Sequence, residues 1–85
     1  MKHATMETLA GFEGLLNQLR AVPGLIEKRP GVFYRKSKAF LHFHEDPEGL
    51  FADWRPGEEW LRAEVSAAPA QTELVAAIRA ACGGS

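Results

Sequence analysis

The fold is decided by residues 32–54, whose sequence is VFYRKSKAFLHFHEDPEGLFADW. Apolar and polar residues alternate along much of this stretch, as they do in strands that bury one face. Three strands are predicted, at 32–36, 39–45 and 50–54. Ser37-Lys38 between the first two runs has the length of a hairpin loop, although not its favoured Asn-Gly chemistry. The second turn, Asp46-Pro47-Glu48-Gly49, has aspartate first, proline second and glycine fourth, as type I turns prefer. The stretch therefore predicts an antiparallel β-meander.

Two amphipathic helices are expected to flank the meander, over residues 6–22 and from residue 67 to the glycines at 83–84. In each segment the apolar residues recur at three- and four-residue spacing, which places them on one helical face. They are Leu9, Phe12, Leu16 and Leu19 in the first segment, and Leu74, Val75, Ile78 and Ala81 in the second. Residues 58–65 allow either a helix or a short fourth strand, and we favour the strand. The expected fold class is α+β: helix, three- or four-stranded antiparallel sheet, helix, with both helices on one face of the sheet.

Length and composition limit the range of functions. Eighty-five residues predict a single domain over 1–85, with residues 1–5 and 83–85 expected to be frayed. A net charge of −1 gives no overall attraction to polyanions or acidic membranes. The single cysteine, Cys82, excludes an internal disulfide. No apolar run reaches the roughly 18 residues of a membrane span, and no signal-peptide pattern follows the N-terminus, so a cytoplasmic location is expected.

Hairpin geometry predicts which side chains share a face of the sheet. If Ser37-Lys38 forms a two-residue loop, Phe33 pairs with His42, and the second turn pairs His42 with Asp53. The helix-covered face then carries Val32, Tyr34, Leu41, Phe43, Leu50, Ala52 and Trp54. The outer face carries Phe33, Arg35, Phe40, His42, His44, Phe51 and Asp53.

Several positions in the middle of the chain resemble the front half of the MmcQ/YjbR-like family. They are Pro23-Gly24-Leu25, Glu27, Pro30, Phe33, Lys38, Phe40 and Glu45-Asp46, within a match over about residues 12–55. Residues 40–53 are also similar to small uncharacterised bacterial proteins with a Phe-Leu-His-Phe-His-Glu-Asp-Pro signature. The resemblance implies a frataxin-like α–β–α arrangement, with an antiparallel sheet covered by helices on one side. It brings no set of nucleic-acid-reading residues, although the family is often described as DNA-binding.

The predicted outer face suggests a partner-binding surface. Three phenylalanines among four ionisable residues are more apolar than a solvated face needs. We therefore favour a non-enzymatic binding or assembly module that forms a homodimer through this face. The alternative is a monomer in which residues 58–65 cover part of the face, with Trp60 lying over it.

Nucleic-acid binding is a second hypothesis. Basic residues gather around the first predicted hairpin, with aromatic residues between them, as single-strand contacts require. They are Lys28, Arg29, Arg35, Lys36 and Lys38.

Metal binding is a third hypothesis. His42 and His44 lie two residues apart on one strand, so their imidazoles point the same way and can approach one metal ion. Asp53 would serve as a third ligand or orient a ring. No nucleophile–base spacing and no glycine-rich phosphate loop occurs in the sequence, so the chain is expected not to be an enzyme and to need no cofactor.

Overall fold

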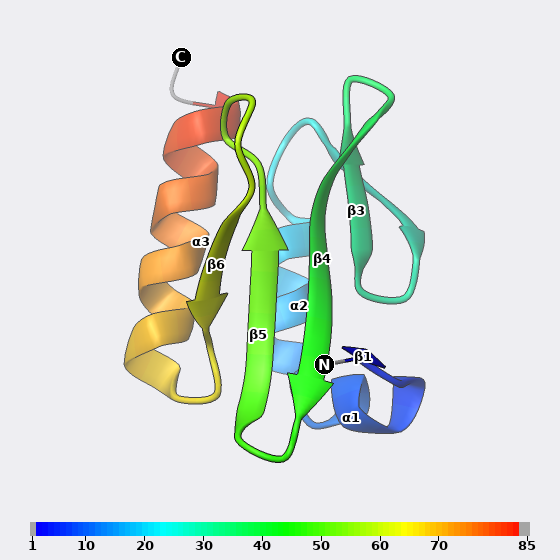
Figure 1. Ribbon diagram of the computed structural model, residues 1–85. Helices are drawn as coiled ribbons and strands as arrows, with labels where there is room; N and C mark the ends of the chain where they lie inside the picture. Colours follow the sequence, from blue (N-terminus) through cyan, green and yellow to red (C-terminus); the bar gives the residue numbers. More distant parts are fainter. Residues whose placement is uncertain (1, 84–85) are drawn as a thin grey trace.

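A computed structural model describes residues 2–83 of the chain. It confirms the α+β class: an antiparallel sheet is preceded by helical segments and followed by a long helix (Figure 1). The sheet has six strands rather than three or four, in the order β2-β3-β4-β5-β6, with β1 paired to β4. The elements are β1 Lys2–His3, α1 Met6–Ala10, α2 Glu13–Arg20, β2 Leu25–Arg29, β3 Val32–Arg35, β4 Lys38–Asp46, β5 Gly49–Trp54, β6 Leu61–Glu64 and α3 Ala68–Gly83.

The first helix is two short helices instead of one over 6–22. Thr5 caps α1, its hydroxyl accepting a hydrogen bond from the backbone N–H of Thr8 at 3.1 Å. The helix ends at Gly11, a residue of low helix propensity. α2 then begins after Phe12 and buries Leu15, Leu16 and Leu19.

Two strands were missed by the sequence analysis. β2 pairs with β3 around the Pro30-Gly31 turn. Because β2 is an edge strand, it carries charged residues, and its sequence shows no clear alternation of apolar and polar residues. β1 pairs with β4 through Lys2 opposite Glu45 and His3 opposite His44, and the fraying expected at residues 1–5 stays a prediction. The nine residues of β4 extend beyond the four of β3, and β1 occupies part of the remaining edge. The fraying expected at residues 84–85 lies outside the described residues.

The core lies between one face of the sheet and helices α2 and α3, which both pack behind the sheet in Figure 1. Its sheet residues include Phe33, Leu41, Phe43, Leu50 and Ala52. The helices contribute their predicted apolar stripes, including Leu74, Val75 and Ile78 of α3. Among the described residues no helix is both long and apolar enough to cross a membrane.

The two hairpin registers have different outcomes. Between β4 and β5 the pairing is as predicted, with His42 opposite Asp53 and Leu41 opposite Trp54. Between β3 and β4 the prediction was wrong: Arg35 pairs with Lys38, so the loop is Lys36-Ser37. Both loop residues have positive φ, 54° and 68°, as a type I′ turn requires. The sequence hides this turn because neither residue is glycine or asparagine.

A β-bulge also makes the β3–β4 pairing differ from the predicted one. Phe33 pairs with Leu41 and Tyr34 with Ala39, which leaves Phe40 as the extra residue of β4. The shifted register and the bulge together bury Phe33 and Phe40 in the core, at 0% and 4% exposed. A one-residue change of register moves side chains to the opposite face of the sheet.

The predicted faces are corrected accordingly. Phe33, Arg35 and Phe40 were assigned to the outer face but lie on the helix-covered side; Arg35 reaches the carbonyl of Cys82 in α3. Val32 and Tyr34 were assigned to the core face but pair with His42 and with the exposed Ile26, on the outer side. Four of the seven predicted outer residues stay there: His42, His44, Phe51 and Asp53.

Candidate metal centre on the outer face of the sheet

The outer face carries two rows of side chains that run across the strands. Directly opposed residues of antiparallel strands point to the same side, so each row follows from the pairing. The first row is Val32, His42, Asp53 and Arg62, and the second is His3, His44, Phe51 and Glu64. The two rows are adjacent on β4, which places His42 next to His44.

All three histidines of the chain meet in these rows. The sequence contains only His3, His42 and His44, and each offers a ring nitrogen within 4.8 Å of those of the other two. The His3 ring centroid lies 4.7 Å from that of His44, and the His42 and His44 centroids are 4.8 Å apart. His3 was not predicted as part of the site, because its position depends on β1. The only signal in the sequence was that it is the one other histidine.

Two buried ring nitrogens, Nδ1 of His42 and Nδ1 of His44, find no hydrogen-bond partner within residues 2–83. Both atoms are inaccessible to solvent. Nδ1 of His44 lies 3.0 Å from Oδ2 of Asp53, which is an ion-pair distance only when the ring is protonated. An unpaired buried polar atom costs about 1–3 kcal/mol. The pair therefore sits in an environment that a further ligand would stabilise.

Asp53 is engaged by an arginine that the sequence analysis did not single out. Arg62 of β6 donates two hydrogen bonds to the Asp53 carboxylate, of 2.7 and 2.8 Å. These bonds hold the pKa of Asp53 below its usual value, against the effect of burial. Asp53 is thus an ionised group beside His44 that would orient this ring, and it does not belong to the cluster of converging ligand atoms.

The surroundings of His42 favour its neutral imidazole. Burial lowers the pKa of His42, and the neighbouring His44 lowers it further, while Asp53 acts in the opposite direction. Neutral imidazole is the form that binds metal.

Trp60 covers part of the outer face. Its ring contacts His42 edge-on, with ring centroids 4.9 Å apart, and Arg55 stacks on Trp60. The segment between β5 and β6 therefore shields this side of the histidines.

The predicted basic cluster is divided between two places. Arg35, Lys36 and Lys38 lie around the β3–β4 turn, whereas Arg29 precedes the turn at the other end of β3. Lys28 extends over the ring of Tyr34, its Nζ 5.7 Å from the centroid. The five cations therefore do not form one continuous surface.

Comparisons with known proteins add no evidence about the function of the chain. No protein-family model, no curated protein and no solved structure matches the chain. The resemblance to MmcQ/YjbR-like proteins stays a prediction, and the functional proposals depend on the geometry of the chain itself.

Proposed function

We propose that the chain is a small module that binds a divalent transition-metal ion through His3, His42 and His44. The observation that carries the proposal is the convergence of every histidine in the sequence on one point of the sheet. Imidazole suits Zn²⁺, Cu²⁺ and Ni²⁺.

The distances fit a site that closes when the ion binds. Two nitrogens bound to one tetrahedral Zn²⁺ at 2.0–2.1 Å lie roughly 3.4 Å apart, so the present spacing of up to 4.8 Å has to shrink by a side-chain rotation. His3 can supply this movement because its side chain is exposed on the short strand β1. His42 and His44 are held by β4, which pairs on both sides.

Three protein ligands leave a fourth position of a tetrahedral ion open. Structural zinc sites use four protein ligands, whereas three ligands leave room for water or for a group from another molecule. The proposal is therefore reversible metal binding, and the expectation that the chain is not an enzyme stays a prediction.

Tag-free protein, stripped with EDTA, tests the proposal by calorimetric titration and thermal unfolding with Zn²⁺, Ni²⁺ and Co²⁺. Zinc at about 100 times its Kd should raise the free energy of unfolding by about 2.7 kcal/mol. Co²⁺ should also give the absorption bands of a site with nitrogen ligands. If none of the three ions binds or shifts the melting temperature, the proposal is wrong.

Matched variants locate the site. His3→Gln should weaken zinc binding at least tenfold while leaving the unfolding of the metal-free protein nearly unchanged, because His3 is exposed. Lys2→Gln is the control, since it alters the neighbouring residue of the same short strand and removes no imidazole. Equal zinc affinity in His3→Gln and Lys2→Gln would exclude His3 as a ligand.

A homodimer formed through the outer face is the second candidate. Phe51, Val32 and Trp60 lie on this face beside the histidines, which supports it. The support is smaller than the sequence suggested, because Phe33 and Phe40 are in the core. Sedimentation of the metal-free and the zinc-loaded protein tests it, and a particle of 9.4 kDa in both samples would exclude the dimer.

A further inference from the structure

A second group of charges lies at the end of the sheet where the β3–β4 turn approaches the loop that follows β5. Four cations and one carboxylate line an open pocket of about 350 Å³ there, within the range of about 300–1,000 Å³ typical of small-molecule sites. The cations are Arg35, Lys36, Lys38 and Arg55, and the carboxylate is that of Glu58. The chain as a whole has a net charge of −1, so this positive charge is a local concentration.

Within the described part of the chain, these cations have no acidic partners. Among the described residues, none of Arg35, Lys36, Lys38 and Arg55 forms an ion pair. Glu58 is the only acid of the lining, which leaves an excess of three positive charges. Ordinary surface cations are often balanced by nearby carboxylates, as Arg20 is by Glu13 and Glu27 in this chain.

The two arginines are held in place by backbone carbonyls. Arg55 donates a hydrogen bond of 3.0 Å to the carbonyl of Ala39, and its own backbone N–H bonds the carbonyl of Phe40 at 2.9 Å. Arg35 donates to the carbonyl of Cys82 at 3.4 Å. A carbonyl fixes the position of a guanidinium without neutralising its charge. Both groups are therefore positioned before any ligand arrives, which reduces the entropy lost on binding.

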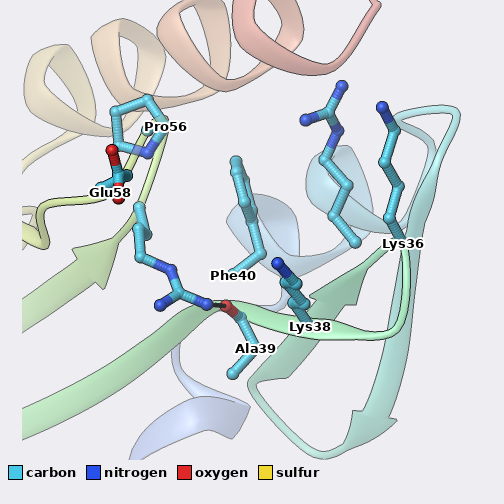
Figure 2. Close-up of a pocket in the computed structure, with 9 residues that line it drawn as sticks. Lys36, Lys38, Ala39, Phe40, Pro56 and Glu58 are labelled. Carbon is cyan, nitrogen blue, oxygen red and sulfur yellow. Dashed lines mark hydrogen bonds between the residues drawn. The ribbon is translucent and has the colours of Figure 1, made fainter.

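The pocket also has an apolar side. Figure 2 shows the ring of Phe40 standing between Lys36 and Lys38 on one side and Pro56 and Glu58 on the other. Phe40 is the bulged residue of β4, so the same irregularity that removed it from the outer face puts it here. A ligand with both an anionic group and a carbon framework would match this lining.

We propose that this pocket binds a small molecule that carries a phosphate group. Phosphate has several oxygens and about two negative charges, and it can accept hydrogen bonds from several cations at once; arginine matches its geometry with two parallel N–H donors. A monocarboxylate would leave most of the positive charge uncompensated. The site uses none of the three histidines.

NMR titrations of the isotope-labelled, EDTA-treated protein test the proposal at 0.15 M salt. EDTA keeps metal out of the histidine site, so the result does not depend on the metal proposal. Phenyl phosphate should give saturable shifts centred on the amides of Phe40 and Arg55, and phenol should give at least tenfold weaker binding. No saturable shifts with phenyl phosphate, or equal binding of phenol, would overturn the proposal.

Two double variants with the same change of charge separate the pocket from general electrostatics. Lys36→Gln/Lys38→Gln should weaken phenyl phosphate binding at least tenfold, while Lys28→Gln/Arg29→Gln should change it less than twofold. Lys28 and Arg29 are exposed on β2 and do not line this pocket. Equal losses in both variants would overturn the proposal.

A titration with a short single-stranded oligonucleotide tests whether the pocket binds a small phosphate-bearing molecule or the phosphates of a nucleic acid. The proposal expects the oligonucleotide to bind more weakly than phenyl phosphate and to be affected similarly by both double variants. An oligonucleotide that binds more tightly than phenyl phosphate, with a loss only in Lys36→Gln/Lys38→Gln, would overturn it in favour of a nucleic-acid contact.

Discussion

For single residues, the roles that we assign on the outer face follow from the hydrogen bonding of a few buried polar atoms. Nδ1 of His42 and Nδ1 of His44 find no hydrogen-bond partner in the described part of the chain, while the nearby Asp53 carboxylate is bound twice by Arg62. The carboxylate is satisfied and the imidazoles are not. This difference is why we assign the ligand role to the histidines and the orienting role to Asp53.

One glycine is required by its neighbours. Gly49 has φ of 145°, and a Cβ there would overlap the Ser66 hydroxyl, which accepts a hydrogen bond from the Leu50 N–H at 2.9 Å. Gly49→Ala should therefore destabilise the protein by about 2 kcal/mol through strain and overpacking. Urea unfolding measures the loss. Gly57→Ala is the control, since a Cβ there meets no atom within 4 Å, and equal effects of the two changes would contradict the explanation.

At the scale of elements, β4 organises the molecule. It pairs with β5 along one edge and with β3 and then β1 along the other. Its bulge directs Phe40 into the core and the cationic pocket, and its regular part directs His42 and His44 outward. One strand thus supplies residues to both proposed sites.

The backbone of the β3–β4 turn is strained. Lys36 and Ser37 both adopt left-handed backbone angles, which cost a residue other than glycine roughly 1–2 kcal/mol. Ser37→Gly should therefore stabilise the protein by about 1 kcal/mol, measured by thermal unfolding. Ser37→Ala gains no such relief because alanine keeps its Cβ. A melting temperature in Ser37→Gly equal to that of Ser37→Ala would show that this turn is not strained.

For the whole molecule, a domain of 85 residues has a small free energy of unfolding. The pKa shifts of its buried ionisable groups should therefore make that free energy depend measurably on pH. The pKa of His42 is lowered on folding, mainly by burial, and the pKa of Asp53 is lowered by Arg62. The two shifts act in different pH ranges.

Metal-free protein should lose stability on acidification in two steps. The contribution of neutral His42 is complete above about pH 6.5, the ordinary histidine pKa, and decreases as the pH falls towards its lower folded value. The contribution of ionised Asp53 persists until the pH falls below about 3.9, where the carboxylate is protonated in the unfolded chain. Urea midpoints from pH 3 to 8 in EDTA measure both, and His42→Gln should reduce the first step. A first step of full size in His42→Gln would assign it to another group.

The fold class and the β4–β5 hairpin could be predicted from local sequence patterns. The β4–β5 register followed from Asp46-Pro47-Glu48-Gly49, because local turn chemistry sets the pairing. The stripe of α3 followed from its periodicity. His42, His44 and Asp53 were placed together for the same reason, since their pairing depends on that turn.

The other features depend on contacts between segments that are distant in the chain. The Lys36-Ser37 turn uses residues without a turn signature, and the Phe40 bulge is determined by packing against the helices, so Phe33 and Phe40 could not be placed from sequence. His3 joins His42 and His44 across about 40 residues because β1 pairs with an edge of β4 that β3 leaves free. Arg55 joins Arg35, Lys36 and Lys38 across about 20 residues. Contacts between distant segments depend on which strand edges and faces remain unpaired, and no local pattern records that.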